Sequence, residues 1–372
     1  MKLFRCQACG QLLYFENTVC ERCRHQLGYR ADIGLLCALE PEGEAFRTLG
    51  QPGQRRFCDN ASHEACNWLV PAESDSRFCQ ACSHNHLVPD LTVPANLPPW
   101  RLIEAAKRRL MYSLLQLGLP VPTRAEQPEI GLAFDILADP GVTGGPKVMT
   151  GHDNGLITIA LAEADDAERE QRRAAMGEPY RTLLGHFRHE SGHYYWDRLV
   201  RDGGQLEGCR AVFGDESLDY NAALQAHYAT GAPADWQAHY VSSYATSHPW
   251  EDFAETWAHY LHIVDTLEMA AAFGISLQPQ LDRRDEMSAE IDLDSYAAPD
   301  IATLMAAWMP LTSAMNALSR SMGARDLYPF ILSPGVIGKL GFIHGLVRGG
   351  AGFGQIAGAA AVDDGNIDKS VG

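Results

Sequence analysis

Residues 188–197 read RHESGHYYWD and contain His189, Glu190 and His193 in the order His-Glu-x-x-His. On an α-helix, residues i and i+4 lie on the same face, so the two imidazoles can contact one metal ion. The glutamate between them can then reach a water bound to that metal, which is the arrangement of a metallopeptidase. The pattern is short, so by itself it leaves an ordinary helix as the competing interpretation.

The residues around this pattern favour a buried helix over about 180–200. Two imidazoles and a carboxylate are costly to bury without partners. Gly192 costs a helix about 1 kcal/mol relative to alanine, which indicates a close approach by backbone or ligand. Residues 156–161, LITIAL, precede the helix and read as an edge strand that could pair with an extended peptide. The apolar flanks of the pattern are Leu183, Leu184, Phe187, Tyr194, Tyr195 and Trp196.

A catalytic zinc usually takes three protein ligands and a water, so a third ligand is required. The metzincin continuation needs glycine at 196 and histidine at 199, but the chain has Trp196 and Leu199. A second predicted helix, over 249–273, must therefore supply the ligand. The candidates share one face of that helix and are Glu251, Glu255 and His259. Asp252 points away from this face. His186 and His262 are expected to support the site or the core rather than bind the metal.

The first 95 residues contain two groups of four cysteines. Paired Cys-x-x-Cys turns present thiolates to one ion, and four thiolates form a closed, structural zinc site. A segment this small cannot build much core, so the metal is expected to supply much of its folding energy. The first group is Cys6, Cys9, Cys20 and Cys23, and the second is Cys58, Cys66, Cys79 and Cys82. His63, His84 and His86 could replace a cysteine as a ligand in the second site. Cys37 and Cys209 belong to neither group.

The net charge of the chain argues against nucleic acids and anionic membranes as binding partners. The 372 residues carry a formal net charge of −17, which repels nucleic-acid phosphates and anionic membranes. The N-terminal MKLFRCQACG has no signal-peptide pattern, and the chain has no run of 18 apolar residues. We therefore expect a cytoplasmic protein in which the cysteines bind metal rather than form disulfides.

The two helical motifs resemble a known class of enzyme. His189-Glu190-x-x-His193 followed by EDFAETW at 251–257 is similar to the gluzincin zinc peptidases, in particular to the lethal-factor-type catalytic domain. The resemblance implies that Glu251 is the third zinc ligand, that Glu255 is a carboxylate behind the ligands, and that Tyr244 is a tyrosine near the zinc. Asp252 departs from that pattern, which has a phenylalanine there. Over most of its length the chain is also similar to a bacterial family of zinc-binding metallopeptidases with an N-terminal zinc ribbon.

These observations predict an α+β fold, in which a zinc-ribbon module is followed by a mainly helical, zincin-like metallopeptidase domain. The proline-rich 86–100 is expected to be a linker, with strands at 132–137 and 156–161 and further helices near 99–118 and 300–323. The predicted units are the ribbon module at 1–95, the peptidase domain at 96–275, a helical region packed on it at 276–348, and a disordered tail at 349–372.

The predicted function is hydrolysis of peptide bonds with three Zn²⁺ ions, one catalytic and two structural. Zinc would activate a water, Glu190 would act as general base, and Tyr244 would donate to the oxyanion. Glu255 would hold a ligand imidazole in its correct tautomer. The alternative is a zinc-ribbon adaptor, or a protein-binding scaffold that keeps a metal site without turnover. The expected partners are a peptide or protein substrate and a protein bound by the ribbon.

Overall fold

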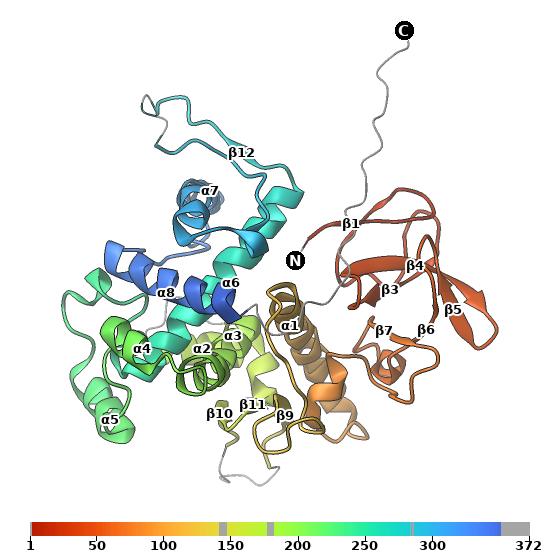
Figure 1. The fold of residues 1–372 in the computed structure, drawn as a ribbon, viewed down its shortest axis with the longest axis horizontal. Helices are drawn as coiled ribbons and strands as arrows, with labels where there is room; N and C mark the ends of the chain where they lie inside the picture. Colours follow the sequence, from red (N-terminus) through yellow and green to blue (C-terminus); the bar gives the residue numbers. More distant parts are fainter. Residues whose placement is uncertain (1, 141–146, 177–181, 283, 285, 351–372) are drawn as a thin grey trace.

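The computed structural model describes residues 2–140, 147–176, 182–282, 284 and 286–350. It confirms the predicted α+β class, with an N-terminal zinc-ribbon region followed by a mainly helical domain. Figure 1 shows the strands of the first region on one side, helix α1 (Leu97–Gln116) beside them, and the remaining helices on the other side. The predicted tail from 349 onward falls largely on 351–372, which lie outside the described residues.

The N-terminal module is built from a short hairpin and an antiparallel sheet. Strands β3 to β7 pair in chain order. The sheet is curved, so its first and last strands approach each other: the Tyr29 amide on β3 donates to the carbonyl of Asn67, just before β7, at 2.8 Å. The strands are β1 (Phe4–Arg5), β2 (Leu12–Leu13), β3 (Gln26–Arg30), β4 (Leu35–Glu42), β5 (Ala45–Thr48), β6 (Gln54–Phe57) and β7 (Leu69–Pro71).

The buried aromatic residues of this module belong to a core that continues into the next domain. Phe15, Tyr29 and Trp68 are buried and form an aromatic cluster, in which the Phe15 and Tyr29 ring centroids lie 4.9 Å apart. Tyr112 of α1 joins the cluster, with its ring centroid 5.3 Å from that of Phe15. The ribbon module and the following domain therefore share one continuous core.

A four-stranded sheet forms the floor of the second domain, in the order β10-β11-β9-β8. Its strands are β8 (Asn85–Leu87), β9 (Ala133–Leu137), β10 (Gly151–Asp153) and β11 (Leu156–Ala160). Both strands predicted for this region are confirmed as β9 and β11. Strand β11 is internal, however, so the prediction that it forms an edge is wrong; the short antiparallel β10 covers it. Leu87 pairs with Asp135 of β9 in parallel, so the predicted linker begins inside the sheet.

The four predicted helices are present as α1, α3 (Leu183–Tyr195), α6 (Pro249–Ala272) and α7 (Ile301–Ser321), and α3 continues as a π-helix over Trp196–Arg201. Helix α7 is long and apolar enough to cross a membrane by length and composition alone, but Leu304, Trp308 and Leu311 are buried against the rest of the protein. The helices that were not predicted are α2 (Asp166–Met176), α4 (Leu206–Phe213), α5 (Tyr220–Thr230) and α8 (Pro334–Gly350). A small hairpin of β12 (Ser276–Leu277) and β13 (Ala289–Glu290) follows α6.

Helices α3 and α6 cross at Gly192. A Cβ atom at this position would lie 2.8 Å from the Ala254 Cα and 3.2 Å from the Trp257 Cβ. The Trp257 indole N–H also donates to the Ser191 hydroxyl at 3.1 Å. The close approach predicted from Gly192 is therefore made by the backbone of α6.

Substituting Gly192→Ala should lower the free energy of unfolding by about 1–3 kcal/mol, because the added methyl group forces two backbones apart. The gain in helix propensity, about 1 kcal/mol, offsets only part of this loss. Gly338→Ala is the matched control, since Gly338 lies in α8 with no atom within 4 Å of its added Cβ. Urea denaturation of both variants checks the prediction, and a Gly192→Ala protein as stable as the parent contradicts it.

Candidate metal centre

The crossing of α3 and α6 brings His189, His193 and Glu251 to one point. The Nε2 atoms of the two histidines lie 3.2 Å apart, and Glu251 Oε2 lies 3.1 Å from the first and 3.5 Å from the second. A tetrahedral zinc ion with bonds of about 2.0–2.1 Å holds its ligand atoms roughly 3.3 Å apart, so this geometry fits zinc. Glu251 Oε2 is also buried without a hydrogen-bond partner among the described residues, as expected of an atom that binds a metal.

Glu251 is positioned and ionised by its surroundings. Helix α6 begins at Pro249 behind the cap His248, whose side chain accepts from the Trp250 amide, and this places Glu251 in the first turn. Burial opposes ionisation, but the facing imidazoles hold the pKa of Glu251 well below its ordinary value. The neighbouring Asp252 points away, as predicted, and pairs with Lys339 of α8 at 2.5 Å.

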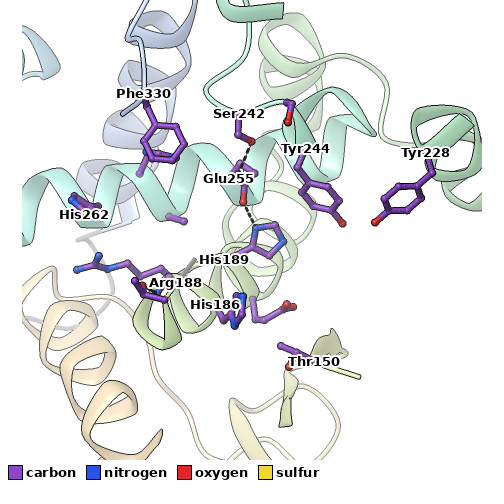
Figure 2. A pocket seen from close by; sticks show the side chains of 16 residues that line it. Thr150, His186, Arg188, His189, Tyr228, Ser242, Tyr244, Glu255, His262 and Phe330 are labelled. Atoms are coloured by element: carbon purple, nitrogen blue, oxygen red, sulfur yellow. Dashed lines mark hydrogen bonds and ion pairs between the residues drawn. The ribbon is translucent and has the colours of Figure 1, made fainter. Parts of the chain in front are cut away.

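The other two candidate ligands on α6 make different contacts. Glu255 Oε1 lies 2.7 Å from His189 Nδ1, and its Oε2 accepts from the Ser242 hydroxyl at 2.6 Å (Figure 2). A carboxylate on the far nitrogen of a metal-binding imidazole fixes its tautomer and orientation. His259 instead has Nδ1 2.7 Å from the Tyr328 hydroxyl and lies outside the metal group.

Two tyrosines face the centre. Tyr244, in a 3₁₀ turn, has its ring 6.0 Å from the His189 ring. Burial and the Glu251 carboxylate raise the pKa of Tyr244, so its hydroxyl stays protonated and able to donate. Tyr220 was not predicted, although its hydroxyl donates to Glu251 Oε1 at 2.7 Å. It lies on α5, which has no fully buried residue, so no apolar pattern in the sequence marks it.

Substituting Tyr220→Phe should weaken zinc affinity at the centre roughly ten- to a hundredfold, the usual cost of losing a hydrogen bond to a metal ligand. The phenyl ring keeps the packing, so the fold should be unchanged. Competition with a zinc chelator, read alongside circular dichroism, measures the effect. Tyr14→Phe on the exposed ribbon surface is the control, and equal zinc affinity in the Tyr220→Phe and parent proteins would show that this hydrogen bond does not hold the ligand.

Glu190 lies next to the three converging groups and is only 8% exposed. Burial raises its pKa, which moves a carboxyl group toward the range where it can accept and release a proton near neutral pH. The indole of Trp250 covers the imidazole of His193 on α3, with the two ring centroids 3.8 Å apart. The centre is thus walled by apolar surface on one side.

The two cysteine groups are also brought together. Sγ atoms lie 3.6 Å apart for Cys6–Cys23 and for Cys9–Cys20, and 3.7 Å apart for Cys66–Cys79. A tetrahedral zinc with Zn–S bonds of about 2.3 Å separates its sulfurs by roughly 3.8 Å, so both groups fit zinc. The second group consists of Cys58, Cys66, Cys79 and Cys82.

The competing histidines lie elsewhere. His84 Nδ1 lies 2.8 Å from the Leu132 carbonyl oxygen, and His86 Nδ1 lies 2.8 Å from Asp135 Oδ1. His63 packs its ring against Trp100. Cys37 and Cys209 are buried outside the clusters.

Comparison with known proteins supports both parts of this arrangement. Residues 96–346 match the family described as "Putative zinc-binding metallo-peptidase", and residues 3–93 match a zinc-ribbon domain. Uncharacterized proteins of Mycobacterium bovis and Mycobacterium tuberculosis are each 42% identical over 348 residues, which cover 93% of this chain and 95% of theirs. No solved structure matches the chain.

Proposed function

This chain belongs to that family of zinc-binding metallopeptidases, and we propose that it hydrolyses peptide bonds by a gluzincin-type mechanism. The observation that carries the proposal is the convergence of His189, His193 and Glu251 on one point beside the buried carboxyl group of Glu190. His189, His193 and Glu251 would hold a zinc ion through three ligands and leave room for a water, whereas each cysteine group would close its site with four.

In the proposed mechanism, each residue of the site has one task. Zinc held by His189, His193 and Glu251 would lower the pKa of a water to about 7 and polarise the scissile carbonyl. Glu190 would accept a proton from the attacking water and deliver it to the leaving amine. The hydroxyl of Tyr244 donates to the oxyanion as it forms. Glu255 keeps the imidazole of His189 oriented throughout.

The substrate is proposed to lie along strand β10 in an extended conformation. This strand forms the edge of the sheet beside α3, and its His152 ring stacks 6.3 Å from that of His193. An exposed edge supplies backbone donors and acceptors that are independent of substrate sequence. We also infer that the enzyme works in the cytoplasm, because eight of its ten cysteines form two groups whose geometry fits zinc rather than disulfides.

Metal counting tests the proposal against the adaptor alternative. The parent protein should contain three zinc ions, and a mild chelator should remove one of them and abolish peptidase activity. Restoring zinc should restore activity, because the three-ligand centre is more open than the two four-cysteine sites. Two tightly held ions, or proteolysis that survives removal of the labile ion, would contradict the proposal and favour an adaptor.

A further inference from the structure

A cavity of about 270 Å³ opens beside the metal centre and runs between α3 and α6 (Figure 2). His189 and Glu190 line it, whereas His193 and Glu251 do not. The cavity therefore extends from the centre to one side, toward the N-terminal end of α3. An apolar cavity of about 150 Å³ holds a benzene ring, so this one has room for a large side chain.

The end of the cavity away from Tyr244 has aromatic walls. Phe330, from the loop before α8, lies edge-on to His259, with ring centroids 4.3 Å apart and an angle of 79° between the rings. His262 follows one turn later on α6 (Figure 2). Burial lowers the pKa of His259 to about 4 and that of His262 to about 3, so both imidazoles are uncharged at neutral pH.

Two charged groups of the wall are already compensated. The Arg188 guanidinium pairs with the buried Asp265, which also accepts from the Ser113 hydroxyl at 2.7 Å. Glu255 has one oxygen on His189 and the other on Ser242. A charged substrate side chain beside Arg188 or Glu255 would therefore lose its water against groups that are already paired, whereas Glu190, the third charged residue of the wall, lies beside the metal centre.

We propose that this cavity binds a large, uncharged aromatic side chain on the substrate residue that supplies the leaving amine. The inference rests on the proposed peptidase function. Glu190 delivers a proton to the leaving nitrogen and lines the cavity, so the residue that carries this nitrogen is the one beside the cavity. Phe330, His259 and His262 then offer ring contacts to its side chain, which a neutral aromatic group satisfies best.

The first test measures binding rather than turnover. Peptide hydroxamates that differ in one side chain (benzyl, carboxymethyl, aminobutyl or hydrogen) are titrated calorimetrically into the zinc-loaded full-length protein. The benzyl compound should bind roughly ten times more tightly than the hydrogen compound, and the two charged compounds should gain nothing. Hydroxamates that bind equally well whatever the side chain, or best when it is charged, overturn the inference and leave the peptidase proposal standing.

Variants of the cavity make this test specific. Ala258→Leu adds volume to the wall and should abolish the benzyl advantage, and Phe330→Ala should reduce it by removing the ring contact. The control is Phe273→Ala, an exposed phenylalanine that follows the last turn of α6, which should leave the advantage unchanged. If both cavity variants still bind the benzyl hydroxamate as much more tightly than the hydrogen compound as the parent does, the aromatic side chain does not bind in this cavity.

Cleavage of a mixed peptide library separates the two proposals. Mass spectrometry of the new amino termini should show phenylalanine and tyrosine enriched roughly tenfold in the parent, with no cleavage by Glu190→Gln. Cleavage that persists in Glu190→Gln contradicts the peptidase mechanism. Cleavage that depends on Glu190 but shows no aromatic enrichment contradicts only the inference about the cavity.

Discussion

The Glu190→Gln protein should keep all three zinc ions and lose peptidase activity by at least about 10²-fold, the usual range for removing a general base. The amide has nearly the shape of the carboxylate, so the packing of this buried side chain is preserved. It cannot accept a proton from water, however, and it cannot pass one to the leaving amine. Because Glu190 is not among the three converging ligands, zinc affinity should stay close to that of the parent.

The measurement pairs kcat/KM on a peptide substrate with the zinc content of the same sample. Glu207→Gln, on the exposed face of α4, is the matched control and should behave like the parent. Full activity in Glu190→Gln would show that another group accepts the proton. Loss of one zinc ion would instead mean that Glu190 holds the metal.

Substituting Lys107→Met should lower the free energy of unfolding by about 3–5 kcal/mol, the cost of leaving one partner of a buried ion pair alone. Lys107 and Glu104 of α1 are fully buried, with Nζ 2.8 Å from the carboxylate. The same carboxylate accepts from the Asn85 side-chain amide at 2.9 Å and lies 3.8 Å from the Cys82 thiol. This pair therefore connects the second cysteine site to helix α1 and strand β8 of the peptidase domain.

The double variant Glu104→Leu/Lys107→Met separates charge from packing. Removing both charges leaves no unpaired ion, so the double variant should be more stable than Lys107→Met alone. Thermal and urea unfolding measure the difference, with zinc content recorded for each protein. A single variant as stable as the parent would show that this pair does not hold the ribbon module to the peptidase domain.

Much of the candidate centre follows from local spacing. A four-residue interval on a helix brings His189 and His193 to one face whatever surrounds them, and paired Cys-x-x-Cys turns present thiolates in the same way. The long helices were predictable because one face of each is apolar. Helices α4 and α5 were missed because they bury little, and α8 because its glycines obscure the buried row Val336, Leu340, Ile343 and Val347.

The sequence by itself determined which side chains can bind metal, because ligand type and spacing within one helix or one turn are local properties. Only the tertiary structure places Glu251, rather than Glu255 or His259, beside the Nε2 atoms of both histidines, since that placement depends on how α6 crosses α3 at Gly192. The packing of other segments against α6 also brings Tyr220 to Glu251, Ser242 to Glu255, and Phe330 to the cavity. These contacts join residues 13 to 71 positions apart, so packing sets them and no pattern along the chain records them.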